Sequence, residues 1–226
     1  MCGRFTLTTD SKKLSEAFTE FEIPEDLVPR YNIAPSQPVA VVANNGQHKL
    51  EFFQWGLIPA WAKDPGIGNR MINARAETLA EKPSFKNAYR RRRCLVLADG
   101  FYEWKKEAHT KTKTPMYVRL VSGKPFAFAG LWEYWHNGDG SEILSCTIIT
   151  TNPNELMAEI HNRMPVILAP EAYERWLDPA ERHPEQLGDL LKPYPTAQMT
   201  AYPVSRVVNS PRNDSPDCIT PLNTVL

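Results

Sequence analysis

Short apolar runs separated by turn residues make up most of the chain, and they predict a domain rich in β-strands. The runs at 39–42 and 50–55 flank Asn44-Asn45-Gly46, which is a typical β-hairpin signal. The run at 94–104 is a strand with a turn near Asp99-Gly100. Further strands are expected at 116–120, 126–131, 144–150 and 166–168.

Helical spacing is confined to short stretches of the chain. Leu14, Phe18 and Phe21 recur at helical intervals and predict an amphipathic helix over 11–21. Three further helices are expected. The first covers 74–92, begins near Asn73 and Arg75, and is broken near Pro83. The second runs from an Asn152-Pro153 cap to about His161, and the third covers 171–176.

The order of these elements sets the fold class. Strands and short helices alternate without the regular spacing of βαβ units, which predicts an α+β fold. We expect a single compact domain over 1–226, with a curved antiparallel, barrel-like β core, short peripheral helices and an irregular tail from about residue 207. The 20 prolines agree with many short elements and ordered loops, because proline is confined to turns, edges and first helical turns.

Composition excludes several classes of protein. Hydrophobic residues at 42% and charged residues at 23% exclude a disordered chain and a coiled coil. No apolar run approaches the roughly 18 residues of a membrane helix, and the first residues lack the apolar core of a secretory signal. The four cysteines are widely spaced, so a zinc ribbon is excluded, and a reduced cytoplasmic setting is expected. Neither metal-ligand spacing nor a phosphate-binding glycine loop is present, and no cofactor is expected.

Charge is unevenly distributed although the chain carries 26 basic and 26 acidic residues. The segment 70–113 holds twelve Lys/Arg against five Asp/Glu, including the run 90–93 of four arginines. Such a segment is consistent with a face that binds a polyanion. The alternative is that the arginines complement the dipole at the end of a helix and are otherwise solvated.

The start of the chain, Met1-Cys2-Gly3, carries the most distinctive chemistry. An initiator methionine before a small residue is commonly removed, which would leave Cys2 with a free α-amine beside its thiol. A 1,2-aminothiol condenses with an aldehyde to an imine, and the sulfur then closes a stable thiazolidine ring. A terminal cysteine can also attack acyl groups with its own amine as the base. The alternative is an inert cysteine at a disordered terminus.

Two titratable residues lie in apolar surroundings. Glu103 is flanked by Tyr102 and Trp104, and a carboxyl in such surroundings has a raised pKa and can act as a general acid. An exposed strand residue paired with a neighbouring lysine is the alternative. His161 ends a predicted helix, a position that favours its protonated form, and the alternative is a structural cap or a core histidine.

Seven ordered blocks together resemble the SOS-response-associated peptidase (SRAP) family, whose members are also described as abasic-site processing proteins. The blocks are MCGRF, RYNIAPSQ, WGLIPAW, INARAET, ADGFYEW, HNRMP and PVSRVVN. The resemblance covers the chain from Cys2 to about Asn209. It implies a compact domain with a basic groove for single-stranded DNA, and a covalent thiazolidine between the terminal cysteine and the aldehyde of an abasic site. It also implies self-removal of Met1 and leaves a strand-cleaving lyase activity open.

The resemblance also implies roles for individual residues. Cys2 would be the nucleophile, Asn73 would orient the opened sugar or the thiazolidine nitrogen, and Glu103 and His161 would move protons. The residues expected along the DNA path are Arg4, Asn32, Trp61, Arg75, Thr150 and Arg163. The family has a second aromatic beside Trp61 where this chain has Ala62, so base stacking is expected to be weaker or shifted.

Two other functions remain open from the residues alone. An N-terminal-nucleophile amidohydrolase also begins Met-Cys-Gly, but it needs an oxyanion hole, and nothing after Gly3 resembles that class. A non-covalent single-strand binding module would make Cys2 incidental. The expected partner is single-stranded DNA containing abasic sites. The expected setting is cytoplasmic, on the nucleoid when DNA is bound, and without an association motif the chain is expected to be a monomer.

Overall fold

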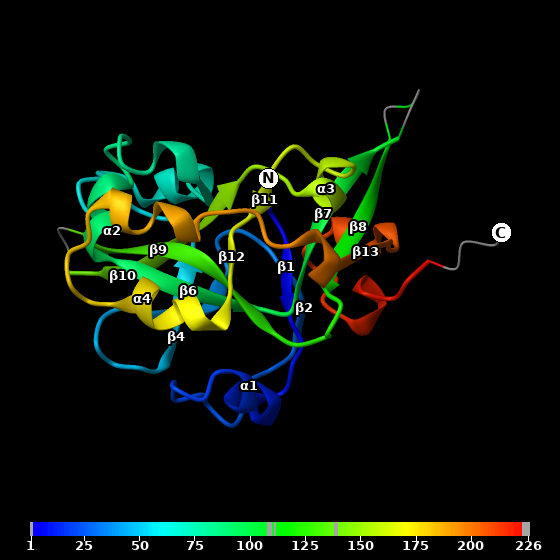
Figure 1. Ribbon diagram of the computed structural model, residues 1–226, viewed down its shortest axis with the longest axis horizontal. Coiled ribbons are helices and arrows are strands. Elements are labelled where there is room, and N and C mark those ends of the chain that lie inside the picture. The colour runs from blue at the N-terminus through cyan, green and yellow to red at the C-terminus, as the bar shows by residue number, and fades with distance from the viewer. Residues whose placement is uncertain (1, 108–109, 111, 138–139, 223–226) are drawn as a thin grey trace.

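The computed structural model describes residues 2–107, 110, 112–137 and 140–222, and its strands form two sheets. The larger sheet contains β3 (Pro38–Ala43), β4 (Leu50–Trp55), β5 (Asn73–Arg75), β6 (Arg93–Ala98), β9 (Phe126–His136), β10 (Glu142–Thr151), β11 (Met164–Pro165) and β12 (Ile167–Leu168). The smaller sheet contains β1 (Phe5–Leu7), β2 (Arg30–Ile33), β7 (Gly100–Lys106), β8 (Lys113–Leu120) and β13 (Met199–Pro203). In Figure 1, β7, β8 and β13 stand together on the right, and β6, β9 and β10 cross the left half.

Five strands of the larger sheet close into a barrel. They pair in the order β10-β4-β3-β6-β9, and β9 pairs back onto β10. The predicted single domain with a barrel-like core is therefore confirmed. Within the ring, the β10–β4 pairing is parallel and the other four are antiparallel, so the expectation of an antiparallel core holds for all but one ring pairing.

The smaller sheet packs on the barrel through aromatic side chains. Phe5 of β1 lies with its ring centroid 5.1 Å from Trp55 and 5.8 Å from Phe128, both of which belong to barrel strands. Phe101 of β7 contacts Phe128 at 6.0 Å. All four rings are fully buried, and each contributes about 1.5–3 kcal/mol or more of burial free energy. These contacts fix where β1 and β7 lie relative to the barrel.

The helices are short and peripheral: α1 (Ser11–Ala17), α2 (Lys86–Arg91), α3 (Glu155–Ala158) and α4 (Tyr173–Leu177) (Figure 1). The helix expected over 11–21 ends four residues early, with Asp10 as its N-cap. The cap of α3 is Asn154 and not Asn152, and that helix ends before His161. Among the described residues, no helix is long and apolar enough to cross a bilayer.

The helix predicted over 74–92 is wrong in its first half. Residues Asn73–Arg75 form β5, which pairs in parallel with residues 148–150 of β10, and α2 begins only at Lys86. The local spacing suits a helix, but backbone pairing with a distant strand overrides it.

Each of the four consecutive arginines has a partner within the protein. Arg90 and Arg91 both pair with Glu181, and Arg92 pairs with Glu133. Arg93 is fully buried, and its guanidinium donates to five backbone carbonyl oxygens near the ends of α2 and α4.

After β13, the described residues of the tail form short 3-10 turns at Arg206–Asn209 and Pro216–Cys218, and Val204 forms an isolated β-bridge with Pro221. The tail is also tied to the smaller sheet. The Asp214 carboxylate accepts hydrogen bonds from the backbone N–H groups of Tyr31 and Asn32 and pairs with Arg30. The tail therefore satisfies donors at the edge of β2.

Candidate active site at the junction of the two sheets

Two strands, β5 and β11, pair with the end of β10. β5 pairs with it on one side, with Thr150 opposite Arg75, and β11 pairs with it on the other, with Thr150 opposite Pro165. Because side chains alternate along a strand, Asn73, Arg75 and Thr150 share one face of this sheet. Asn73 and Arg75 of the INARAET block thus lie beside Thr150, which is about 75 positions away in the sequence.

Cys2 connects this face to the smaller sheet. It lies just before β1, and its backbone carbonyl accepts a hydrogen bond of 2.7 Å from Nδ2 of Asn73. Its Sγ lies 3.9 Å from the carbonyl oxygen of Arg4, and the residue is fully buried. The backbone of Cys2 is therefore held by the side chain of Asn73 in β5.

Glu103 of β7 provides the carboxyl group beside Cys2. It is only 3% exposed, which excludes the solvent-exposed strand residue weighed as the alternative. Burial raises the pKa of Glu103, and His161, when protonated, opposes that rise. Burial also raises the pKa of the Cys2 thiol, and the charge of Glu103 raises it further. Cys2, Glu103 and His161 are therefore electrostatically coupled.

His161 lies in the turn between α3 and β11. Its Nδ1 accepts a hydrogen bond of 3.1 Å from the backbone N–H of Arg163. The Arg163 guanidinium forms a bidentate pair with Glu77 and also donates to the carbonyl oxygen of Thr150 at 2.6 Å. Arg163 thus joins the histidine turn to the end of β10.

Arg4 and Asn32 lie on the side of the smaller sheet where the tail docks. Nη1 of Arg4 donates to Oδ1 of Asn32 at 2.7 Å and to the carbonyl oxygen of Val208 at 2.8 Å. Its guanidinium lies 5.9 Å from the ring centroid of Trp104, and burial lowers its pKa. Asn32 is fully buried, and its Nδ2 donates to three carbonyl oxygens of the tail. Both side chains therefore hold the tail in place.

Trp61 and Arg75 are the most accessible of the predicted DNA-path residues. Trp61 lies in the loop after β4 with its ring 61% exposed, and Ala62 beside it is buried against Ile58 and Trp135. Arg75 is exposed on β5. Nearby, the buried Oδ1 of Asn73 and Oγ1 of Thr150 have no hydrogen-bond partner within the described part of the chain. Buried acceptors of this kind are available to a ligand.

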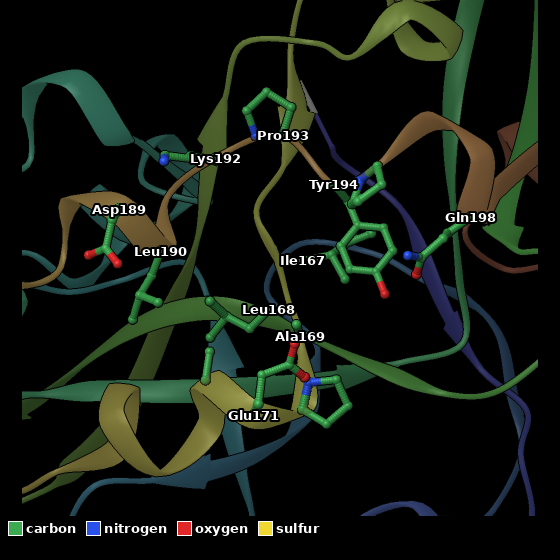
Figure 2. A pocket seen from close by; sticks show the side chains of 13 residues that line it. Ile167, Leu168, Ala169, Glu171, Asp189, Leu190, Lys192, Pro193, Tyr194 and Gln198 are labelled. Carbon is green, nitrogen blue, oxygen red and sulfur yellow. The ribbon is translucent and has the colours of Figure 1, made fainter.

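The described surface cavities lie elsewhere. Figure 2 shows one between β12 and the segment 189–198, lined by Leu168, Glu171, Asp189 and Tyr194 among others. None of its lining residues belongs to the ten predicted site residues, and the Asp189 carboxylate is already bound to Arg175.

Three acidic residues that support the site were not singled out from the sequence. Glu77 binds Arg163, and Asp214 ties the tail to β2. Asp99 accepts hydrogen bonds from Thr6 and from two backbone N–H groups at the end of β1, which fixes that strand beside β7. Asp99 was visible only as a turn residue. Glu77 lies in the INARAET block, but its partner lies 86 positions away and local spacing gives no signal for it.

Comparison with known proteins gives consistent matches over nearly the whole chain. The sequence model of a family described as SOS response associated peptidase (SRAP) matches residues 1–211. The abasic site processing protein YoqW of Bacillus subtilis is 51% identical over 222 residues, covering 97% of this chain and 99% of that protein. The abasic site processing protein HMCES of Pongo abelii is 30% identical over 276 residues, covering 100% of this chain and 77% of its own length. A crystal structure of a protein from Bacteroides thetaiotaomicron matches with a TM-score of 0.86 at 28% identity, covering 98% of this chain and 100% of that one.

Proposed function

Because the chain belongs to the SOS response associated peptidase family, we propose that it captures abasic sites in single-stranded DNA as a covalent adduct of Cys2. The observation that carries the proposal is the coupling of Cys2 to Glu103 and His161, with Asn73 holding the Cys2 carbonyl. An N-terminal aminothiol beside two proton-transferring groups is suited to trapping an aldehyde. The ring-opened sugar of an abasic site presents such an aldehyde.

The proposed reaction proceeds in two bond-forming steps. The α-amine of Cys2, freed by loss of Met1, adds to the sugar C1′ aldehyde, and the resulting carbinolamine loses water to form an imine. The thiol then adds to C1′ while its proton passes to the nitrogen, which gives the thiazolidine. Both steps conserve the oxidation state, so they require no redox partner. Reversal returns the aldehyde and the free aminothiol.

Glu103 and His161 move the protons in these steps. A buried carboxyl with a raised pKa keeps its proton to a higher pH than an ordinary glutamate, so it can donate to the hydroxyl that leaves as water. The thiol also needs a base before it closes the ring, because burial and Glu103 raise its pKa. We assign these transfers to Glu103 and His161 together. The same pair serves the self-removal of Met1, which lies outside the described residues.

We place the DNA on the face that carries Arg75 and Trp61. Both are exposed, and a cation with an aromatic ring suits a phosphate and an unpaired base. We propose that Arg4, Asn32, Thr150 and Arg163 line the rest of the DNA path. Binding is independent of sequence, since selectivity comes from the missing base and its aldehyde. In this proposal the protein acts as a monomer in the cytoplasm, on the nucleoid when it is bound to DNA.

The test is a denaturing gel of the purified protein after mixing with single-stranded DNA that carries one abasic site. The proposal predicts a protein–DNA band that survives heat and detergent, and an intact mass that lacks Met1. Cys2→Ala abolishes that band. Because this variant keeps an α-amine, borohydride is expected to trap its imine and restore a band. Cys94→Ala, which changes a buried barrel cysteine outside the site, serves as the matched control and forms the adduct normally.

The competing functions give different results in the same assay. A non-covalent binding module retards native DNA but leaves no band after denaturation, whether or not Cys2 is present. A strand-cleaving lyase step shortens the labelled DNA after the adduct has formed. Retention of Met1 in the mature protein would contradict the proposal, because the amine would be blocked.

A further inference from the structure

The ion pair between Glu77 and Arg163 lies beside the proposed site but has no role in the chemistry described so far. The two side chains are joined at two points, Nη1 to Oε1 at 2.7 Å and Nη2 to Oε2 at 2.9 Å. The hydrogen bond from Arg163 lowers the pKa of Glu77, and the charges of Arg163 and Arg75 add to the effect. Glu77 is therefore ionised at neutral pH, and the pair is a true bidentate salt bridge.

The hydrogen-bond donors at the end of the Arg163 guanidinium are fully used within the protein. Nη1 also donates to Oδ1 of Asn152 at 3.1 Å, and Nη2 also donates to the carbonyl oxygen of Thr150 at 2.6 Å. The four Nη protons therefore have four acceptors. Nε is buried, and the Arg163 side chain is 11% exposed. A DNA phosphate could reach this guanidinium only by displacing a partner that it already has.

The backbone of Arg163 orients the imidazole of His161. The N–H of Arg163 donates to Nδ1 of His161, and this bond exists only while Nδ1 carries no proton. The neutral imidazole then carries its proton on Nε2. Two residues after Arg163, Pro165 pairs with Thr150 in β11. Arg163 is thus fixed by its side chain and by the strand that follows it.

We infer that Glu77 is a positioning residue for adduct formation, holding Arg163 against β10 so that the Arg163 backbone presents His161 with Nε2–H toward the reacting atoms. The inference rests on the proposed function. Glu77 follows β5 directly, within the turn Ala76–Thr78. Its pair with Arg163 therefore ties the segment that carries Asn73 to the turn that carries His161. Arg163 thus links the two segments through its side chain and orients His161 through its backbone.

The test separates DNA binding from chemistry. Binding is measured as Kd for single-stranded DNA with a tetrahydrofuran abasic analogue, which lacks the aldehyde. Chemistry is measured as the first-order rate of adduct formation at saturating reactive DNA. Glu77→Gln is expected to lower that rate by about 10- to 100-fold, as a misplaced catalytic group does, with Kd changed less than about twofold. Arg75→Ala is expected to weaken Kd.

The matched control is Asp189→Asn. Asp189 and Arg175 form the same kind of bidentate pair, and Asp189 lines the pocket of Figure 2. This variant is expected to keep both Kd and rate. If Glu77 instead shields Arg163 from DNA, Glu77→Gln will tighten Kd and leave the saturated rate unchanged. That result would overturn the inference.

A second measurement does not depend on the adduct. The ¹⁵N spectrum of the His161 imidazole, assigned with His161→Ala, is recorded at about pH 8.5, where an ordinary imidazole is neutral. The wild-type ring is expected to show the Nε2–H tautomer with a hydrogen-bonded Nδ1, and Glu77→Gln is expected to give a tautomer mixture. Unchanged signals and an unchanged rate in Glu77→Gln would refute the inference alone. Failure of the wild-type protein to form any adduct would refute the proposed function.

Discussion

Replacement of Asn73 is expected to slow adduct formation much more than it weakens DNA binding. Its Nδ2 donates to the carbonyl oxygen of Cys2 at 2.7 Å, so the amide fixes the residue that carries both nucleophiles. Its Oδ1 is buried without a hydrogen-bond partner among the described residues. That oxygen is available to accept from the sugar hydroxyl or from the thiazolidine N–H.

The expected magnitude follows from these two interactions. Loss of a hydrogen bond that leaves a buried partner unsatisfied costs about 1–3 kcal/mol. At about 1.4 kcal/mol per factor of ten, the rate falls by roughly 5- to 150-fold in Asn73→Ala. Asn73→Asp keeps the shape of the side chain but turns a lone pair toward the Cys2 carbonyl and adds a negative charge near Glu103. We therefore expect it to be at least as slow as Asn73→Ala.

The assay is single-turnover adduct formation at saturating single-stranded DNA, quantified on denaturing gels, with Kd for the aldehyde-free analogue measured in parallel. Intact mass first establishes that each variant has lost Met1. Asn45→Ala is the matched control, because its Nδ2 also donates to an oxygen, that of Glu51, but on the exposed β3–β4 hairpin. A rate within twofold of wild type for both Asn73 variants, or a loss found entirely in Kd, would refute the reasoning.

Three further predictions concern stability. Arg93→Leu leaves five backbone carbonyl oxygens without their donor and is expected to lower the free energy of unfolding by about 3 kcal/mol or more, measured by urea denaturation. Because burial raises the pKa of Glu103, the free energy of unfolding falls as the pH rises through that pKa. Glu103→Gln should therefore raise the melting temperature at pH 7. Below about pH 4, where Glu103 is protonated in both states, the variant and the wild type should have the same melting temperature. Asp214→Asn weakens the hydrogen bonds to Tyr31 and Asn32 and should lower the free energy of unfolding by about 1–2 kcal/mol, whereas an unchanged melting curve would show that the tail does not support β2.

The strands that sequence predicts well are those whose signals are local. The hairpin of β3 and β4 follows from two apolar runs around Asn44-Asn45-Gly46, and the β6–β7 turn follows from Asp99-Gly100. β5 has no such signal. Its three residues are a strand only because β10, more than 70 positions later, offers a free edge for parallel pairing. Such pairing is a tertiary effect, and helical spacing in the same residues therefore misleads.

The same distinction applies to the site. The aminothiol that Cys2 would expose and the apolar neighbours of Glu103 can be read from the sequence, and the structure couples Glu103 electrostatically to both Cys2 and His161. The ion-pair partners of the charged residues cannot be predicted in this way. Arg90 and Arg91 look like a polyanion-binding run, but they meet Glu181 across the fold. Formal charge along the sequence does not reveal which charges are already neutralised in space.

Burial of Cys2 also determines which of its two nucleophiles reacts first. The thiol is scarcely ionised at neutral pH because burial and Glu103 raise its pKa, whereas an ordinary α-amine, with a pKa of about 7.7–8.0, is partly neutral there. In the proposed reaction the amine is therefore expected to attack the aldehyde first, and the sulfur to follow after the imine has formed beside it. A thiol kept protonated is also slow to react with oxidants and alkylating agents, since the thiolate is the reactive form. The buried position is thus expected to protect the sulfur until the amine has captured a carbonyl, a step that needs no thiolate.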